Sequence, residues 1–348
     1  MRLEELPGSD AWVFLAATGG GAGAQDRLWS VPGASSFFAG AVFPYAQREL
    51  EAFIGYEPLK YVSVDTAISM AIAAYMRACL SCPEGKTPIG VGTTASLATL
   101  QDHRGAHMAW TAAISGRGRV HIACDEYEKG GPIRRVPDGM AVDDMIEDVL
   151  LDAAQEGMGG KSADDLLISH VFKRPWFRVG GRRELAPISN IELLPGAFNP
   201  LHAGHLEISN PNTIFQLSLR TPHKPAVSIT EALRRTALIN AAWRDVLIEL
   251  EASTFLAKAR KWPGSTFIIG SDTLQRILDP KYGHPIEPML EEFHQLRTKF
   301  LVSQRMGDPD TRDIVHFNGP WPKWSRMFSH VGTGRHAGLS STQLRAAK

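Results

Sequence analysis

The chain has 348 residues, more than one hydrophobic core usually holds, and its 44% hydrophobic and 21% charged residues are typical of a globular protein of two domains. Lys plus Arg and Asp plus Glu each number 37, so no overall field would attract a polyanion, and we expect no nucleic-acid partner. Three cysteines are too few for a disulfide framework. Glu4 and Glu5 stand where a secretory signal is positively charged, and no apolar run is as long as a membrane span, so we expect a cytoplasmic protein without a membrane partner.

The first half of the chain alternates short apolar runs with helical ones, which indicates an α/β domain. Residues 11–17 read as a strand and are followed at once by a glycine-rich segment. Ser63 or Asp65 would cap a helix at 66–80, where apolar residues recur at helical spacing. Further strands are expected at 89–92, 108–114 and 120–123, and an amphipathic helix at 142–155.

Within this half, residues 28–45 read LWSVPGASSFFAGAVFPY. This segment resembles the nicotinamide mononucleotide deamidase family, also known as the C-terminal domain of competence-damage proteins, and the layout is similar over residues 10–155. The alternative is an unrelated α/β domain with a glycine-rich loop, because such loops are weak motifs on their own.

The residues that the resemblance would require for deamidation are altered. The family's run Glu-Ser-Cys-Thr-Gly-Gly carries a nucleophilic serine, whereas residues 16–21 here read AATGGG, so that Thr18 is a substitute nucleophile or a remnant. Tyr45 matches a family tyrosine, but Leu50 falls where a lysine should activate the nucleophile. We therefore expect a vestigial deamidase site at Thr18 and Tyr45, in an inactive domain that serves ligand sensing or assembly into a homo-oligomer.

A change of composition follows this domain. Residues 157–190 contain several glycines and a polar run, which predicts a domain boundary. The expected division is a deamidase-like domain at 1–160, a linker at 161–189 and a second domain at 190–348. Residues 166–172 and 176–179 could form strands that bracket the connection.

The second half repeats the alternation of strands and helices. The expected strands are 191–194, 213–219, 266–269 and 298–303. One helix is expected to start near Leu201, and two others to cover 230–242 and 288–296. Such alternation predicts a parallel sheet that binds ligands at the carboxyl ends of its strands. The fold class is therefore α/β, with two domains that each contain a mainly parallel sheet and flanking helices.

The strand at 191–194 runs into a motif of glycine, phenylalanine, proline and two histidines. Gly196 and Gly204 allow close approach of a ligand, and the helix start after the strand favours an anion. His202 and His205 are three residues apart, hence on one face of the helix, and both can direct a ring nitrogen at a triphosphate. A histidine pair alone would more often be a surface pair, a helix cap or half of a metal centre. The joint occurrence of six fixed positions at a strand-to-helix junction favours a site.

This motif resembles the signature of the nucleotidyltransferase superfamily, whose fold is Rossmann-like and which includes the nicotinamide and nicotinate mononucleotide adenylyltransferases. Later segments resemble the rest of the family pattern in order: Lys224 after the second strand, the run Gly270-Ser271-Asp272, Arg305 after a later strand, and the ending from Ser340 to Arg345. The resemblance covers residues 190–348.

The resemblance implies adenylyl transfer from ATP, with release of pyrophosphate, to nicotinamide or nicotinate mononucleotide in NAD synthesis. His202 and His205 would be catalytic, and Lys224 and Arg305 would contact phosphate or substrate. The implied nucleotide-binding residues, besides the two histidines, are Gly196, Ala197, Phe198, Gly270, Asp272, Ser340, Ser341 and Arg345. Mg²⁺ would be coordinated mostly by ATP and water, so no metal site made of protein ligands is expected.

Two other functions stay open at this point. One is transfer from ATP or CTP to another phosphate ester, such as phosphopantetheine. The other is a non-catalytic protein that senses nucleotides. In each case the expected partners are small-molecule nucleotides.

Overall fold

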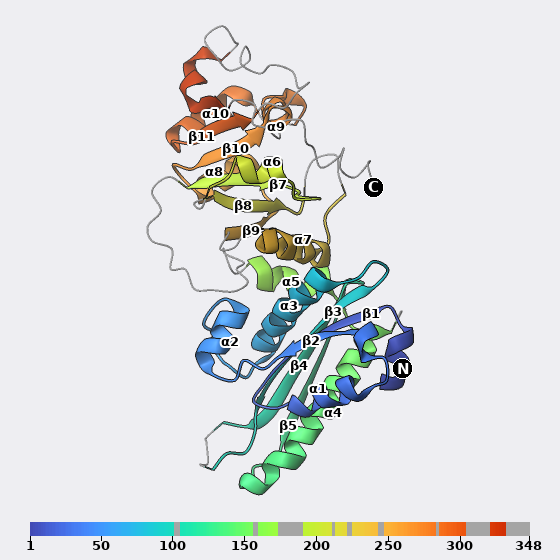
Figure 1. Cartoon of the computed structure of the whole chain (residues 1–348). Helices are drawn as coiled ribbons and strands as arrows, with labels where there is room; N and C mark the ends of the chain where they lie inside the picture. The colour runs from blue at the N-terminus through green and yellow to red at the C-terminus, as the bar shows by residue number, and fades with distance from the viewer. Residues whose placement is uncertain are drawn as a thin grey trace. The chain divides into compact units, whose positions relative to one another are not determined.

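The computed structural model describes residues 1–100, 105–155, 159–172, 191–210, 213–220, 225–242, 247–282, 285–303 and 321–331. Its contacts divide the chain into two compact units, Met1–Arg182 with Ser228–Ala242, and Arg183–Val227 with Trp243–Lys348. Each unit contains one six-stranded sheet within the described residues, flanked by helices (Figure 1). The predicted α/β class is confirmed.

The sheet of the first unit has the strand order β2-β1-β3-β4-β5-β6. Strands β2, β1 and β3 are parallel, whereas β3 to β6 pair antiparallel, so this sheet is mixed. All the strands predicted for the first half lie in it. The bounds are β1 (Ala11–Thr18), β2 (Phe38–Val42), β3 (Thr87–Ser96), β4 (His107–Ser115), β5 (Arg119–Tyr127) and β6 (Lys161–Ser162).

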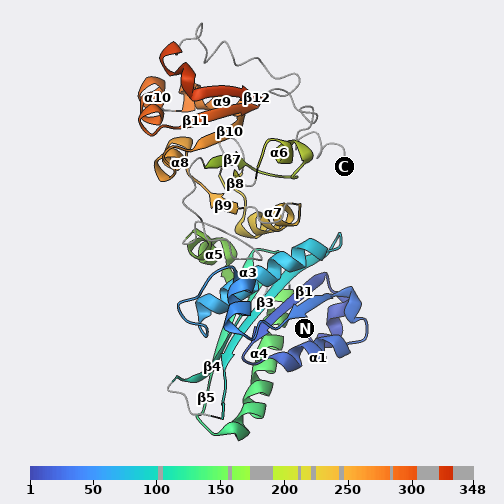
Figure 2. The same cartoon turned by 60° about the vertical axis from the view of Figure 1, so that its left-hand side comes forward.

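Helices cover both faces of this sheet (Figure 2). Helix α3 (Val64–Ser81) and α2 (Gln47–Ile54) lie on one face, and α1 (Ala22–Ser30) and α4 (Arg135–Ala154) lie on the other. The predicted helices at 66–80 and 142–155 are thus confirmed. Of the two caps expected for α3, Ser63 is the one observed, since its hydroxyl accepts a hydrogen bond from the amide of Thr66 at 3.3 Å.

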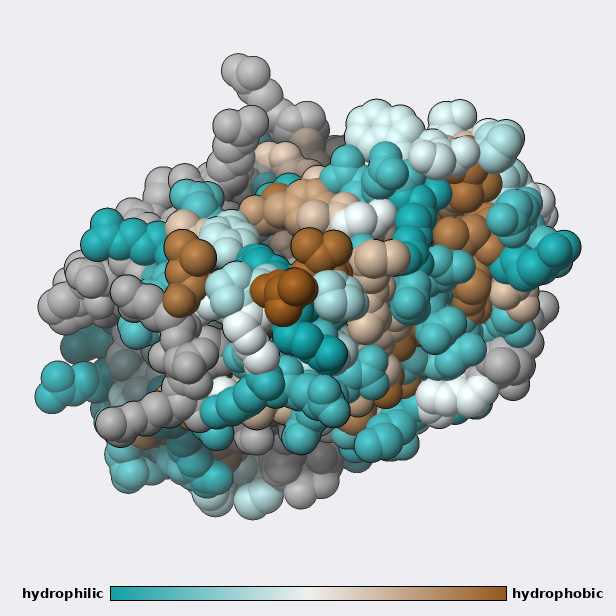
Figure 3. Space-filling model, turned by 90° about the horizontal axis from the view of Figure 1, so that it is seen from below, coloured by the Kyte–Doolittle hydropathy of each residue, from teal (hydrophilic) through white to brown (hydrophobic). Residues whose placement is uncertain are grey.

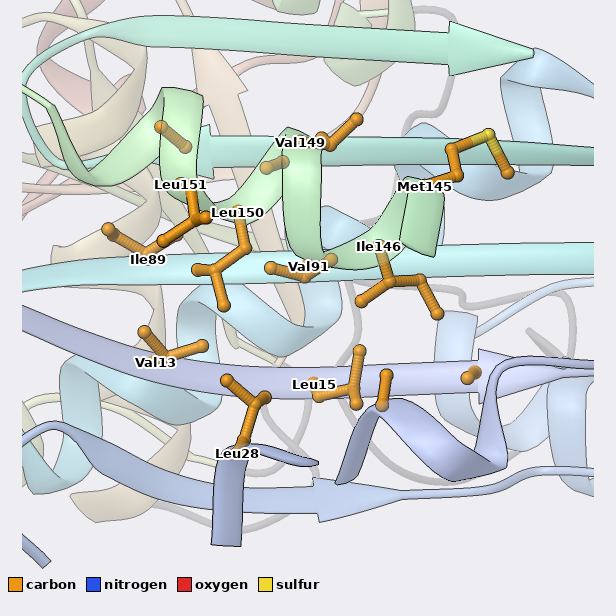
Figure 4. Close-up of a cluster of buried hydrophobic side chains, with 14 of the residues drawn as sticks. Val13, Leu15, Leu28, Ile89, Val91, Met145, Ile146, Val149, Leu150 and Leu151 are labelled. Atoms are coloured by element: carbon orange, nitrogen blue, oxygen red, sulfur yellow. The ribbon is translucent and has the colours of Figure 1, made fainter. Parts of the chain in front are cut away.

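Strand β1 divides its side chains between the two faces, as a period of two requires. Val13 and Leu15 belong to the core cluster under α1 and α4, and Phe14 and Ala16 belong to the cluster under α2 and α3. Figure 4 shows the first cluster, in which the apolar side chains of α4 pack on those of β1 and β3. The side chains labelled there are Val13, Leu15, Leu28, Ile89, Val91, Met145, Ile146, Val149, Leu150 and Leu151.

Helix α3 approaches β3 unusually closely, and two glycines make this possible. A Cβ added at Gly90 would lie 2.1 Å from the backbone nitrogen of Tyr75, and one at Gly92 would lie 2.2 Å from that of Ala71. Neither glycine has a positive φ, so it is the space that requires glycine at these positions. The two glycines therefore set the distance between α3 and the sheet.

The sheet of the second unit has the order β12-β11-β10-β7-β8-β9, and every pair is parallel. The chain begins in the middle at β7, moves outward to β9, returns to the middle at β10 and moves outward again to β12. This is the arrangement of Rossmann-like sheets, which bind ligands where the strand order reverses, here between β7 and β10. The bounds are β7 (Glu192–Gly196), β8 (Thr213–Ser218), β9 (Leu247–Glu251), β10 (Thr266–Gly270), β11 (Lys299–Ser303) and β12 (Phe328–Val331).

The helices of the second unit include two that begin beside the central strands. Helix α6 (Ala203–Glu207) follows β7, and α9 (Ser271–Ile277) follows β10. Helices α8 (Phe255–Lys261) and α10 (Ile286–Gln295) contact one another. The core beneath them is aromatic. The centroid of the Phe300 ring lies 5.6 Å from that of Phe267 and 5.1 Å from that of Phe293.

Helix α7 (Ile229–Ala242) confirms the helix predicted at 230–242, but it belongs to the first unit. It packs against α3 and α5 (Ala163–Phe172). A carboxylate oxygen of Asp164 accepts a hydrogen bond from the amide of Ile229 at 2.6 Å, and the hydroxyl of Tyr75 donates to the carbonyl of Thr230 at 3.3 Å. The first turn of α7 is therefore capped by a residue from a distant part of the sequence.

The strand expected at 166–172 is wrong, because these residues lie in α5. The hydroxyl of Ser162 accepts a hydrogen bond from the amide of Asp165, and Asp164 and Asp165 place negative charge in the first turn, which stabilises a helix start. Residues 161–172 of the expected linker thus form β6 and α5. The strand expected at 176–179 lies outside the described residues.

The first unit exposes apolar side chains where α4 begins. Ile133, Val136 and Met140 are all exposed, at a spacing that brings them to one side of the helix. Figure 3 shows apolar side chains scattered among hydrophilic ones on the face seen from below. The homo-oligomer stays a prediction. Within the described part of the chain, no helix is long and apolar enough to cross a membrane.

A cluster of buried charges lies between β9 and α8. The side chain of Lys258 is 3% exposed, and Glu249 and Glu251 are buried beside it. Lys261 pairs with Glu249 and, at 3.6 Å, with Glu251. Burial lowers the pKa of Lys258 to about 8, although the two glutamates favour its charged form.

This depressed pKa predicts an unusual pH dependence of stability. Between pH 8 and the pKa of an unfolded lysine, the unfolded chain binds more protons than the folded one, so the free energy of unfolding should rise with pH, by at most about 3 kcal/mol. Urea unfolding at a series of pH values, compared between the wild type and Lys258→Met, measures this contribution. We expect the rise to be absent in Lys258→Met.

Lys261→Met is the matched control, because the pKa of Lys261 is raised. Burial alone would lower it, but the hydrogen bonds to Glu249 and Glu251 and the charges of these two carboxylates together outweigh burial. Its contribution to stability is lost as pH rises, so this variant should keep the rise due to Lys258. Equal pH slopes for wild type and Lys258→Met would contradict the prediction.

Candidate functional site

The segment after β7 turns sharply into α6. Gly196 ends the strand, Ala197 and Phe198 follow, and the peptide between Asn199 and Pro200 is cis. Helix α6 then begins with His202 as its N-cap, close to the predicted start at Leu201. The segment from Gly196 to His205 therefore leaves the carboxyl end of the central strand, at the edge where Rossmann-like sheets bind ligands.

The two predicted histidines lie against one another. Their ring centroids are 3.8 Å apart and the rings are inclined by 33°. The amide of His205 donates to the carbonyl of His202 at 2.9 Å, and the amide of His202 faces Nδ1 of His205 at 3.4 Å. His202 is 9% exposed, while His205 is partly exposed. The expected pairing of the two imidazoles on one side of the turn is observed.

The second predicted segment leaves the neighbouring strand β10. Gly270 ends this strand and is the N-cap of α9, and Asp272 lies in the first turn of the helix. The carboxylate of Asp272 bends back, since a Cβ at Gly270 would lie 2.8 Å from its Oδ1, and its Oδ2 accepts a hydrogen bond from Arg276 at 3.0 Å. Asp272 thus offers a partly exposed carboxylate beside the end of β10.

Strands β7 and β10 are direct neighbours and run parallel, with Glu192 beside Thr266 and Leu193 beside Phe267. Their carboxyl ends therefore open at the same edge of the sheet, one on each side of the point where the strand order reverses. The histidine pair lies after one strand, and Gly270 to Asp272 lie after the other. Five other predicted ligands fall outside the described residues, namely Lys224, Arg305, Ser340, Ser341 and Arg345.

The described residues hold no group of three His, Cys, Asp or Glu side chains placed as metal ligands.

Of the predicted deamidase residues in the first unit, Thr18 ends β1, Tyr45 follows the carboxyl end of the neighbouring strand β2, and Leu50 lies in α2. The hydroxyl of Thr18 donates to the carbonyl of Pro44 at 3.0 Å, and a carbonyl oxygen cannot activate it as a general base would. Tyr45 is 71% exposed, and its hydroxyl oxygen accepts a hydrogen bond from the guanidinium of Arg135 at 3.4 Å. Leu50 is buried in the apolar cluster under α2 and α3. Among the contacts of the described residues, the one given for the Thr18 hydroxyl is with a carbonyl and not with a base.

A buried carboxylate lies against the first turn of α1, directly after the glycine-rich segment. Asp143 of α4, 8% exposed, accepts a hydrogen bond from the amide of Ala24 at 3.0 Å. A Cβ at Gly23 would lie 2.2 Å from its Oδ2. Burial raises the pKa of Asp143, and the amides of Ala24 and Gly23 oppose this by favouring the anion. The first turn of α1 is therefore occupied by a carboxyl group of α4.

Comparison with known proteins gives structural neighbours for the N-terminal part of the chain. They are competence-damage proteins. A competence-damaged protein (CinA) superfamily protein from Enterobacter cloacae is 14% identical, with a TM-score of 0.34 over 43% of this chain and 92% of its own. A protein of the same superfamily from Escherichia coli is 15% identical, with a TM-score of 0.35 over 42% and 83%. The competence/damage inducible protein CihA from Agrobacterium tumefaciens is 17% identical, with a TM-score of 0.34 over 44% and 96%.

Comparisons of sequence add no relative. No protein-family model matches the chain, and no curated protein matches it. The assignment of nucleotidyl transfer to the second unit stays a prediction.

Proposed function

We propose that the second unit transfers an adenylyl group from ATP to the phosphate of nicotinamide or nicotinate mononucleotide, with release of pyrophosphate. The observation that carries this proposal is the position of the histidine pair and of Gly270 to Asp272 at the carboxyl ends of β7 and β10, on the two sides of the reversal in strand order. The resemblance of the same two segments to the nucleotidyltransferases supports it independently.

The reaction needs no covalent intermediate on the enzyme. A phosphate oxygen of the mononucleotide attacks the α-phosphorus of ATP in line, the bond from that phosphorus to the bridging oxygen breaks, and pyrophosphate leaves with the electron pair. Mg²⁺ enters as part of the ATP substrate. The protein would then contribute position and charge neutralisation.

His202 and His205 would serve as donors to the triphosphate as negative charge develops on the leaving group. Asp272, with its partly exposed carboxylate beside β10, would accept hydrogen bonds from hydroxyls of the acceptor. This division gives one central strand to each substrate, so that the phosphate of one meets the α-phosphorus of the other above the sheet edge.

For the first unit we propose a non-catalytic role, in ligand sensing or in assembly. Its Thr18 has a carbonyl where a base is needed, Leu50 is a core residue, and Asp143 fills the first turn of α1. Each of these removes one requirement of nucleophilic or phosphate-binding chemistry.

The test is a panel of acceptors supplied to the purified full chain with ATP and Mg²⁺, with pyrophosphate as the product measured. Release is expected with nicotinamide or nicotinate mononucleotide and not without an acceptor. Release of pyrophosphate with phosphopantetheine, but with neither mononucleotide, would contradict the proposed acceptor. A parallel series with CTP decides between the nucleotides, and binding of ATP without release from any acceptor would favour a sensor.

A further inference from the structure

Phe198 has a backbone conformation that a bulky residue rarely adopts. Its φ is +46°, in the left-handed region, and its side chain is 3% exposed. Such a conformation costs on the order of 1–3 kcal/mol and persists only where its surroundings enforce it. The contacts of the ring therefore need an explanation.

The ring of Phe198 joins the histidine pair to the core. It meets the ring of His205 edge to face, with centroids 5.1 Å apart and planes at 70°. On the core side it lies 5.2 Å from Phe215, a fully buried residue of β8. Edge-to-face pairs of this kind are favourable and directional. His205 thus contacts a ring that is anchored on a central strand.

Gly196 leaves room for this ring. A Cβ at position 196 would lie 2.9 Å from Cζ and 3.0 Å from Cε1 of Phe198. Gly196 does not have a positive φ, so its backbone alone does not call for glycine. Glycine two residues before phenylalanine in the motif therefore follows from one requirement: a side chain at position 196 would collide with the ring of Phe198.

We infer that Phe198 is a positioning residue: its ring, anchored on Phe215 and accommodated by Gly196, holds His205 against His202. The effect on catalysis rests on the proposed adenylyl transfer, whereas the effect on the position of His205 does not. Because a displacement of about 1 Å can cost up to about 100-fold in rate, the buried ring of Phe198 can govern turnover through the position of His205.

The test uses Phe198→Leu, Gly196→Ala and the double variant in the full chain. Phe198→Leu keeps an apolar side chain and removes the ring, and we expect kcat to fall by about 10-fold to 100-fold with the KM for ATP changed far less. Gly196→Ala should lower kcat similarly in the wild-type background, because the new methyl group displaces the ring. In the Phe198→Leu background the same substitution should have little further effect.

Phe293→Leu is the control for general loosening of the core, since Phe293 is fully buried against Phe300 away from the site. It should lower the unfolding temperature and leave kcat unchanged. An equal loss of kcat from Gly196→Ala in both backgrounds, or a kcat of Phe198→Leu no lower than that of Phe293→Leu, would overturn the inference.

A second measurement separates this inference from the proposed function. The imidazole carbon-bound protons of His205 sense the ring current of Phe198, so their NMR resonances should move in Phe198→Leu and in Gly196→Ala, but not in Phe293→Leu. Unmoved His205 resonances in both site variants would overturn the positioning role, even if no acceptor supported pyrophosphate release.

Discussion

His205→Ala is expected to lower kcat for adenylyl transfer by about 100-fold to 1,000-fold, the usual effect of removing one donor that stabilises charge in a transition state. The imidazole lies 3.8 Å from that of His202 at the carboxyl end of β7, where the triphosphate is expected. Nδ1 of His205 lies 3.4 Å from the amide nitrogen of His202, which is long for a hydrogen bond, and we expect the fold to stay cooperative in this variant. Steady-state kinetics and thermal unfolding followed by circular dichroism measure the two effects.

His294→Ala is the matched control, because His294 is an exposed histidine on α10. It should leave both kcat and the unfolding temperature unchanged. Turnover of His205→Ala equal to that of His294→Ala would refute the role of His205.

Gly92→Ala is expected to destabilise the first unit by about 3 kcal/mol, the upper part of the range for overpacked cores. The added methyl group would lie 2.2 Å from the backbone nitrogen of Ala71 and 2.5 Å from the carbonyl oxygen of Ala67. Both atoms belong to the backbone of α3, so no side chain can rotate away, and the helix must shift from the sheet. Urea unfolding measures the change as a lower midpoint.

Gly131→Ala is its control. Gly131 has open space around its Cβ position and no positive φ, so its replacement should change stability by no more than about 0.5 kcal/mol. If Gly92→Ala were as stable as Gly131→Ala, the close packing of α3 on β3 would be wrong.

Periodicity in the sequence was sufficient for the helices α3, α4, α7 and α10. It was insufficient for α1 and β2, because only Ala24 and Leu28 of α1 are buried and every residue of β2 is half-buried. The antiparallel part of the first sheet had a readable signal: Gly116 and Gly118 fall between strands predicted at 108–114 and 120–123. Gly118 has a φ of +80° in that turn, so a hairpin could have been expected there.

The sequence of α7 could not predict that this helix belongs to the first unit. Its pattern indicates a helix, but Thr230 and Arg235 are buried among its apolar residues because α7 packs against α3 and α5. Asp164, which caps it, is 65 residues distant. Only the folded chain reveals such a contact.

The candidate site divides in the same way. Spacing alone placed His202 and His205 together, since residues three apart on a helical turn must meet. The neighbourhood of β7 and β10, by contrast, depends on strand order, which local pattern does not encode. Asp143 was missed because its partner Ala24 is 119 residues away and nothing in either segment indicates the other.

Following the α-phosphorus of ATP tests the central claim most directly. With ATP labelled at that atom, and with nicotinamide or nicotinate mononucleotide as acceptor, the label should pass into a dinucleotide while the pyrophosphate stays unlabelled, and His205→Ala should form almost none of this product. Label that remains in ATP with both acceptors, or that reaches the dinucleotide equally well in His205→Ala, would contradict adenylyl transfer at the His202–His205 site.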